Sequence, residues 1–285
     1  LAKAHSTEMI EAIARASYEA TYERPVKTKY DKDIDSNTSA IYPGTYKQAL
    51  MSVECAVLGA DSLVSGQTDL AITVSRPPGH HAGREFYHGF CYFNIAAVAA
   101  EAMKESGKKV AILDFDIHHG DGTQDIFYDD PNVLYASLHA DPNIVMPGTG
   151  HADEEGGEHA KGTVINIPLP IGVDTETYIR LLDGVNERIK EFAPDYLIVE
   201  AGFDGHKDEF PDLPPITLLD DMDYFEIGKK IGQLELPSLV IFGGGYNRDV
   251  TASAFLSYIH GMEAGKRILR KELFTPDTLL PDERQ

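Results

Sequence analysis

The sequence contains no tryptophan, and only two of its 285 residues are cysteines. Two cysteines, Cys55 and Cys91, are too few for a disulfide framework, so we expect a reduced, cytoplasmic setting. No apolar stretch approaches the ~20 residues of a membrane-spanning helix. The first residues also lack the charged and then apolar pattern of a signal peptide. We therefore expect a cytoplasmic protein without a membrane segment.

Basic residues are scarce: Lys and Arg number 25 against 46 Asp and Glu, which gives a formal net charge of −21. Because a nucleic-acid-binding surface needs a basic stripe, we expect no direct contact with nucleic acid. A negative chain attracts cationic ligands, although the same charge also suits solubility or adaptation to salt. Hydrophobic residues make up 42% of the chain, enough for a sizeable core.

Short apolar runs alternate with helical patterns along the chain. The runs are apolar throughout, as "LIV" and "LVIF" show, and this is typical of a parallel sheet covered by helices on both faces. No linker, repeat or low-complexity tract interrupts them, so we predict one α/β domain over residues 1–285 with a mostly parallel central sheet. The predicted strands are 70–75, 109–116, 132–139, 163–169, 195–202 and 238–245, and the predicted helices are 7–22, 46–66, 94–107, 175–192, 216–234 and 252–268.

Polar side chains cluster directly after four of these strands. In open α/β sheets, ligands bind beyond the carboxyl ends of the strands, so we expect these side chains to meet in one site. They are His80 and His81 after the first strand, Asp114, Asp116, His118 and Asp121 after the second, Asp204 and His206 after the fifth, and Tyr246 after the last.

A metal centre is the first chemistry that this cluster suggests. Asp114, Asp116 and His118 are spaced by two, so they share one side if the strand conformation persists. Asp116 and His118 then bind one metal, Asp204 supplies a third ligand, and a fourth position stays open for water, as in catalytic zinc sites. Ligation by nitrogen and oxygen also suits Fe(II), Mn(II) or Co(II). In the alternative reading, the carboxylates only cap helices or end turns.

Tandem histidines and a glycine-rich tyrosine loop supply groups for acid–base chemistry. His80 and His81 face different environments, and a carboxylate behind each, from Asp114 or Asp121, would set its tautomer. The glycines of "GGGYN" let the backbone approach a ligand, and the hydroxyl of Tyr246 can donate to a developing oxyanion. A phosphate-binding loop is disfavoured because the Lys-Ser/Thr pair is missing.

Five motifs stand out in chain order: "RPPGHHAG…GFCYFN", "DFDIHHGDGTQDIFY", "SLHADP…PGTGHADE", "EAGFDGH" and "GGGYN". Together they resemble the histone deacetylase superfamily, in the branch of class II deacetylases and acetylpolyamine amidohydrolases. The resemblance runs from about Arg76 to Tyr246. It implies the three-layer arginase/deacetylase-like fold and zinc-dependent hydrolysis of N-acetyl amides. The family's first strand has no counterpart here, which we interpret as trimming before Leu1.

The resemblance also implies a role for each matching position. His81 would be the general base and acid, His80 its electrostatic partner, and Tyr246 the group that polarises the acetyl carbonyl. Asp114 would support His80, and Asp121 would support His81. The remaining implied roles are the zinc ligands Asp116, His118 and Asp204, and a potassium ion near Asp114, Asp116, His118, Ser137 and Leu138.

Substrate-binding positions follow from the same resemblance. Gly89 and Phe90 match one wall of the acyl tunnel, and Met146 stands on the opposite wall, where relatives often have Phe. Ordinary core packing is the alternative for Phe90 and Met146. Asp35 is the candidate for an aspartate at the rim that grips the substrate backbone. In "KDEFPDLPP", where relatives continue to Asp-Pro-Leu, the three acidic residues form either an acidic rim or, as we expect, solvated loop charges: Asp208, Glu209 and Asp212.

The sequence thus predicts a zinc deacetylase of N-acetylated amines. Its substrate would be a small cationic acetylpolyamine, which the charge and the motifs favour, or acetyl-lysine in a protein. A homodimer is a further expectation. Two alternatives stay open: a catalytically inactive module that binds acylated amines, and a binuclear manganese ureohydrolase of the same fold, which needs more bridging carboxylates than these motifs supply.

Overall fold

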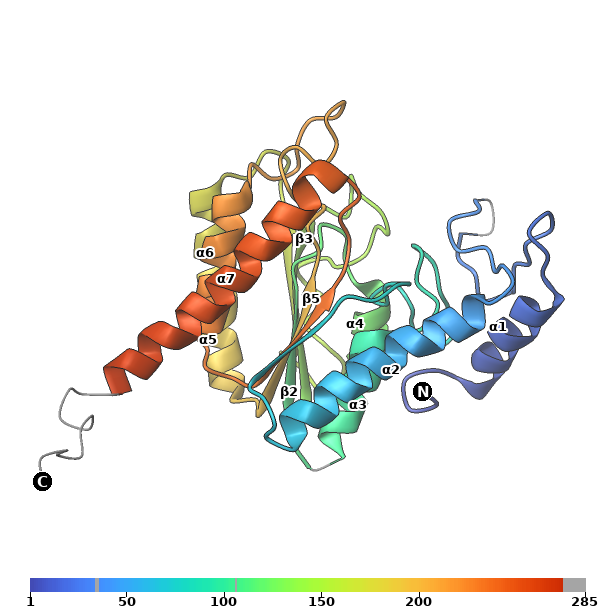
Figure 1. Ribbon diagram of the computed structural model, residues 1–285, viewed down its shortest axis with the longest axis horizontal. Helices are drawn as coiled ribbons and strands as arrows, with labels where there is room; N and C mark the ends of the chain where they lie inside the picture. Colours follow the sequence, from blue (N-terminus) through green and yellow to red (C-terminus); the bar gives the residue numbers. More distant parts are fainter. Residues whose placement is uncertain (34–35, 106, 274–285) are drawn as a thin grey trace, which may run out of the picture.

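A six-stranded parallel sheet forms the centre of the protein, in the order β1-β6-β5-β2-β3-β4 (Figure 1). The structure, a computed structural model, describes residues 1–33, 36–105 and 107–273, with side chains as far as residue 266. The strands are β1 (Leu70–Thr73), β2 (Val110–Asp114), β3 (Val133–Ala140), β4 (Val164–Leu169), β5 (Tyr196–Ala201) and β6 (Ser238–Phe242). The predicted fold class is confirmed, and every strand pair in the sheet is parallel.

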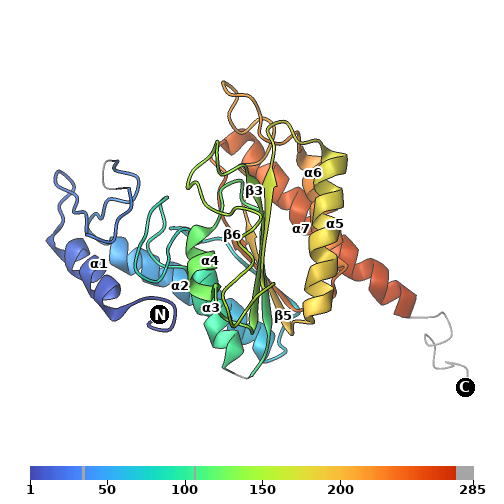
Figure 2. The same cartoon turned by 180° about the vertical axis from the view of Figure 1, so that it is seen from behind.

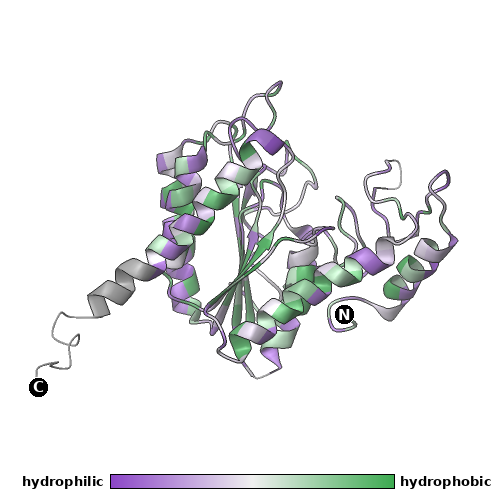
Figure 3. Ribbon diagram, in the orientation of Figure 1, coloured by the Kyte–Doolittle hydropathy of each residue, from purple (hydrophilic) through white to green (hydrophobic). Residues whose placement is uncertain are grey.

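Each central strand is buried on both faces. In β2, Val110 and Ile112 belong to one hydrophobic core, whereas Ala111 and Leu113 belong to the other. This follows from the period of two along a strand, and it explains why the strands are apolar throughout (Figure 3).

Helices lie on the two sides of the sheet in two groups (Figures 1 and 2). The first group is α1 (Thr7–Glu19), α2 (Thr45–Val64), α3 (Ile95–Lys104) and α4 (Asp121–Phe127). In this group, α1 packs against α2 rather than on the strands. The second group is α5 (Thr175–Phe192), α6 (Asp221–Gly232) and α7 (Arg248–Leu273). Within the described residues, no helix is both long enough and apolar enough to cross a bilayer.

The start of α3 is attached to α4, the short helix beside the polar cluster. The side chain of Asn94 caps α3 by accepting the N–H of Ala97 at 2.8 Å, a typical N-cap interaction. Its amide nitrogen donates to Thr123 Oγ1 of α4 at 2.9 Å. One buried side chain therefore holds both helices in place next to the tandem histidines.

Several elements differ from the sequence-based expectation at their ends, and three of these differences have a clear local cause. Helix α4 was missed, because its seven residues lie inside a polar motif and give no clear helical period. Helix α6 begins at Asp221, where Asp220 forms a capping box, rather than at residue 216. Strand β2 ends at Asp114 rather than at residue 116, so the strand conformation does not persist to His118. Asp114 Oδ1 accepts the N–H of Asp116 at 3.0 Å, and this turn ends the strand.

Candidate active site

Asp116, His118 and Asp204 meet beyond the carboxyl ends of β2 and β5. Their ligand atoms all lie within 4.8 Å of one another. His118 Nδ1 is 2.9 Å from Asp204 Oδ2 and 3.1 Å from Asp116 Oδ1. Both carboxylates are buried, whereas His118 is partly exposed. The turn after β2 therefore places Asp116 and His118 beside Asp204, the third residue that was expected to join them from another strand end.

Two glycines allow these carboxylates to converge. A Cβ on Gly244 would lie 2.4 Å from Asp204 Oδ2 and 2.6 Å from Asp116 Oδ2. A Cβ on Gly202 would lie 2.4 Å from the Cα of Asp116. The N–H of Gly244 instead donates to Asp116 Oδ2 at 2.8 Å. Any side chain at position 244 would push against both carboxylates.

The three residues fit a divalent transition metal. One imidazole nitrogen and two carboxylates, with a fourth position open, match the donor set of a catalytic zinc site. The pKa of His118 shows how strongly this place attracts positive charge: burial by itself lowers it, but Asp116 and Asp204 raise it to about 10. Iron(II) would also suit the ligands.

Each of the tandem histidines has its own carboxylate. His80 Nδ1 lies 3.1 Å from Asp114 Oδ2, and His81 Nδ1 lies 2.9 Å from Asp121 Oδ1. Burial lowers the pKa of His80, but the charges of Asp116 and Asp114 outweigh burial and raise it well above its ordinary value. Burial, together with the charge of neighbouring His80, lowers the pKa of His81 to about 3. A neutral His81 that donates its Nδ1 proton to Asp121 keeps Nε2 free to accept a proton.

Gly89 sets the position of the His81 ring. It has a φ of +55°, and a Cβ there would lie 2.3 Å from His81 Cδ2. Only glycine leaves room for the imidazole at this turn. Gly89 also lines the cavity above the candidate metal ligands, and its role as a wall of an acyl tunnel stays a prediction.

Sequence reasoning missed two further partners of Asp121. His88 Nε2 lies 2.8 and 3.0 Å from its two oxygens, and Lys32 Nζ lies 3.2 Å from Oδ2. His81, His88 and Asp121 also satisfy the geometry of a metal cluster. We interpret them as a hydrogen-bonded network, because the neighbouring ammonium of Lys32 disfavours a cation there. A single histidine between Tyr and Gly carries no sequence signal that could have revealed this contact.

A cavity of about 570 Å³ opens above the candidate metal ligands. Phe90 is 44% exposed and Met146 is 43% exposed, so neither is a core residue, and both line this cavity. Asp35 lies outside the described residues. Asp33 lines the cavity in the same segment, and its Oδ2 accepts the N–H of Gly89 at 3.0 Å. The remaining lining residues are Ser36, Thr38, His81, Gly89, His118, Phe210 and Tyr246.

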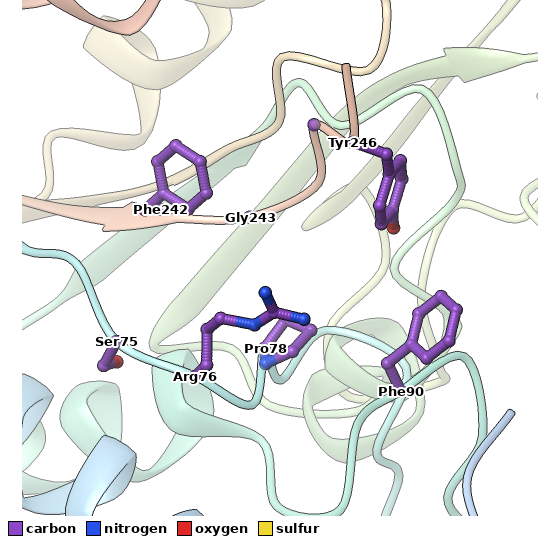
Figure 4. Close-up of a pocket in the computed structure, with 8 residues that line it drawn as sticks. Ser75, Arg76, Pro78, Phe90, Phe242, Gly243 and Tyr246 are labelled. Carbon is purple, nitrogen blue, oxygen red and sulfur yellow. The ribbon is translucent and has the colours of Figure 1, made fainter. Parts of the chain in front are cut away.

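Tyr246 stands at the junction of this cavity with a smaller one of about 70 Å³. Its ring centroid is 6.1 Å from that of Phe90. Figure 4 shows Phe242 and Tyr246 on one side of the smaller cavity and Arg76, Pro78 and Phe90 on the other. Burial and the charges of Asp116 and Asp204 raise the pKa of Tyr246, so its hydroxyl keeps its proton and can donate.

One expectation about the acidic loop after Asp204 is wrong. Glu209 is only 4% exposed, and its carboxylate accepts the backbone N–H groups of Tyr246 and Asn247. It is therefore neither a rim charge nor a solvated one. Asp208 and Asp212 are exposed, as expected of solvated charges.

The residues of the predicted potassium site come from β2, β3 and the turn after β2. Asp114 and Ser137 are neighbours on adjacent parallel strands, and Leu138 follows in the buried part of β3. Ser137 Oγ also lies 2.8 Å from His139 Nδ1. Potassium binding beside Asp114, Asp116 and His118 stays a prediction.

These features define a parallel α/β protein with a candidate metal centre at the carboxyl edge of its sheet. The sequence matches the histone deacetylase domain over residues 1–262, and the chain belongs to this family. It is 38% identical to acetylpolyamine amidohydrolase 1 of Pseudomonas aeruginosa over 242 residues, which cover 84% of this chain and 67% of that protein.

Two further comparisons agree with the family. The chain is 35% identical to histone deacetylase 15 of Arabidopsis thaliana over 258 residues, which cover 88% of this chain and 44% of that protein. Its fold matches the crystal structure of acetylpolyamine aminohydrolase from Burkholderia pseudomallei with a TM-score of 0.83 and 29% identity, over 93% of this chain and 82% of that chain. The chain spans about two thirds or less of the acetylpolyamine amidohydrolases that it matches.

Proposed function

We propose that this protein is a zinc-dependent amidohydrolase that removes acetyl groups from N-acetylated amines. The observation that carries the proposal is the convergence of Asp116, His118 and Asp204 beneath a cavity that His81 and Tyr246 also line. Zinc held by these three residues would polarise the acetyl carbonyl and activate water. Family membership supports the same reaction class.

The side chains around the candidate ligands supply proton transfer and charge stabilisation. His81 accepts a proton from the attacking water at Nε2, because Asp121 holds the proton on Nδ1. The protonated His81 then donates to the leaving amine. The hydroxyl of Tyr246 donates a hydrogen bond to the oxygen that becomes negative in the tetrahedral intermediate. His80, backed by Asp114, adds positive charge next to His81. In keeping with the family resemblance, a potassium ion beside Asp114 and Ser137 would stabilise the turn after β2 that carries Asp116 and His118.

A small cationic acetylpolyamine is the substrate class that we propose. Relatives that the chain matches at 38–40% identity include acetylpolyamine amidohydrolases from bacteria. Asp33 lines the cavity, and the net charge of −21 attracts a cation. The exposed side chain of Met146 is flexible, so the tunnel can adapt to a thin aliphatic chain.

The two alternative functions lack support from the described residues. A module that had lost turnover would be expected to lack one of the proposed proton-transfer groups, yet His81, Asp121 and Tyr246 are all present around the cavity. A binuclear ureohydrolase needs carboxylates that bridge two metals. The second cluster, His81, His88 and Asp121, shares no residue with the first.

Metal counting combined with kinetics tests the proposal. The protein is stripped with a chelator, reloaded with zinc, and assayed on N-acetylputrescine and on an acetyl-lysine peptide. We expect one zinc per chain, recovery of acetate release with zinc, and a higher kcat/KM for N-acetylputrescine. Two manganese ions per chain with urea release would support the ureohydrolase. Zinc binding without hydrolysis of either compound would support the binding module, and equal efficiency on both would remove the preference for polyamines.

A further inference from the structure

The loop that carries Tyr246 is attached firmly at its start. After β6, the N–H of Gly243 donates to the carbonyl of Ala201 at 2.8 Å. Gly244 follows, with its N–H on Asp116 and its carbonyl accepting the N–H of Phe203 at 2.9 Å. These bonds fix the loop against the candidate metal ligands.

The next residue interrupts this attachment. Gly245 has a φ of +131°, a conformation that residues with a side chain rarely adopt, and a Cβ there would lie 2.6 Å from Thr251 Cγ2. The chain therefore turns sharply just before Tyr246. The bonds of Gly243 and Gly244 alone do not determine where the phenol points.

Glu209 provides the anchor beyond this turn. Its Oε1 accepts the N–H of Tyr246 and, at 3.1 Å, the N–H of Asn247, while Oε2 lies 3.2 Å from the same N–H of Asn247. The amide of Asn247 reaches back to the carbonyl of Asp208 at 2.7 Å. Two segments far apart in sequence are thus joined at the position of the tyrosine.

The burial of Glu209 indicates a dedicated role. Glu209 is only 4% exposed, and a buried carboxylate is costly unless it is paired or hydrogen-bonded. In the described part of the chain, no Lys, Arg or His forms a salt bridge with it. The backbone N–H groups and the positive end of α7, which begins at Arg248, compensate the charge instead.

We propose that Glu209 is a positioning residue that holds the Tyr246 hydroxyl over the candidate metal centre. This proposal rests on the proposed function, because it assigns to Glu209 the orientation of the oxyanion donor. Glu209 itself does not line the cavity, so it acts only through the backbone of Tyr246 and Asn247.

Kinetics of matched variants give the first test. Glu209→Ala should lower kcat by about 10- to 100-fold and change KM by less than about twofold. The reason is that a shift of the Tyr246 hydroxyl by about 1 Å can lower the rate by up to about 100-fold. Glu209→Gln keeps an acceptor oxygen and should restore most of the activity. Asp212→Asn removes an exposed charge from the same loop and should leave both kcat and KM unchanged. An unchanged kcat in Glu209→Ala, or equal losses in the Ala and Gln variants, would overturn the proposal.

A double-mutant cycle separates positioning from general destabilisation. If Glu209 acts through the hydroxyl of Tyr246, adding Glu209→Ala to the Tyr246→Phe protein should lower kcat by less than about twofold. A full, additive loss in that background would show that Glu209 supports the site by another route. Zinc content per chain should be the same in all four proteins, because Glu209 contacts no candidate ligand directly.

The absence of tryptophan allows a test that needs no turnover. In a Tyr246→Trp protein the indole at position 246 is the only one, so its acrylamide quenching reports the order of this loop. Adding Glu209→Ala should raise the quenching constant, and adding Glu209→Gln should raise it less. Should Glu209→Ala fail to fold, Glu209→Asp withdraws the carboxylate by one methylene and gives the same comparison. Equal quenching with and without Glu209 would refute the anchor, whether or not the protein hydrolyses amides.

Discussion

At the scale of single residues, Tyr246 offers the sharpest test of the proposed chemistry. Its hydroxyl is protonated and faces the cavity, whereas its backbone lies on a loop already held by other bonds. Tyr246→Phe should therefore lower kcat by roughly 10²- to 10³-fold, as loss of one oxyanion donor does. Metal analysis should still find zinc at the wild-type ratio. Loss of zinc would instead show that the residue supports the ligands.

His5 shows how a buried imidazole away from the site makes stability depend on pH. Its Nδ1 lies 2.8 Å from the carbonyl of Gly83, and its Nε2 accepts the N–H of Asn94 at 2.8 Å. These partners select one neutral tautomer, and burial lowers the pKa from 6.5 to about 4. Below pH 6.5 the unfolded chain binds more protons than the folded one, so stability should fall as the pH drops from about 6.5 to about 4.

The contribution of neutral His5 to the free energy of unfolding is at most about 3 kcal/mol, and it is fully present above pH 6.5. Denaturant unfolding at several pH values measures it, with His5→Gln as the comparison, since an amide can donate and accept but does not titrate in this range. The variant should lose less stability on acidification than the wild type. His119 and His139, whose pKa values burial also lowers, titrate equally in both proteins. Parallel pH curves for the two proteins would contradict the assignment to His5.

At the scale of elements, α5 contains a glycine that the fold does not need. Gly184 is exposed in the middle of this helix, and a Cβ there would meet no atom within 4 Å. Gly184→Ala should stabilise the protein by about 0.5–1 kcal/mol, because alanine loses less backbone entropy in a helix. A thermal melt measures the change, and acetate release should be unaffected. A lower melting temperature would mean that position 184 has a partner outside the described residues.

The elements also show where sequence reasoning succeeds. Apolar strands and their order along the chain could be predicted because burial on both faces leaves a continuous hydrophobic run. The residues at which helices and strands begin and end were harder to predict, since these ends depend on single hydrogen bonds. Asp114 ends β2 by turning back on Asp116, and no periodicity reveals such a turn. The grouping of Asp116, His118 and Asp204 was nevertheless found, because parallel strands bring their carboxyl ends together wherever each strand stops.

Contacts made through the backbone escaped prediction for a related reason. Glu209 lies in a loop of mixed charges, where Asp208 and Asp212 are exposed. Its burial depends on the N–H groups of residues 246 and 247, which lie next to it only in the folded chain. The same holds for His88, whose partner Asp121 is 33 positions away. Side chains that serve a distant backbone or carboxylate carry no local pattern.

At the scale of the whole molecule, the net charge of −21 makes the proposed substrate preference sensitive to salt. A cationic substrate is attracted over a distance of about 10 Å at 0.1 M ionic strength, and added salt screens that attraction. The kcat/KM for N-acetylspermidine, which keeps two positive amines, should therefore fall severalfold as salt rises. An uncharged acetylated amine of similar length is the control, and its kcat/KM should stay nearly constant. If both compounds responded alike, the acidic character of the chain would not assist capture of the substrate, and the case for a polyamine would depend on its relatives and on the cavity alone.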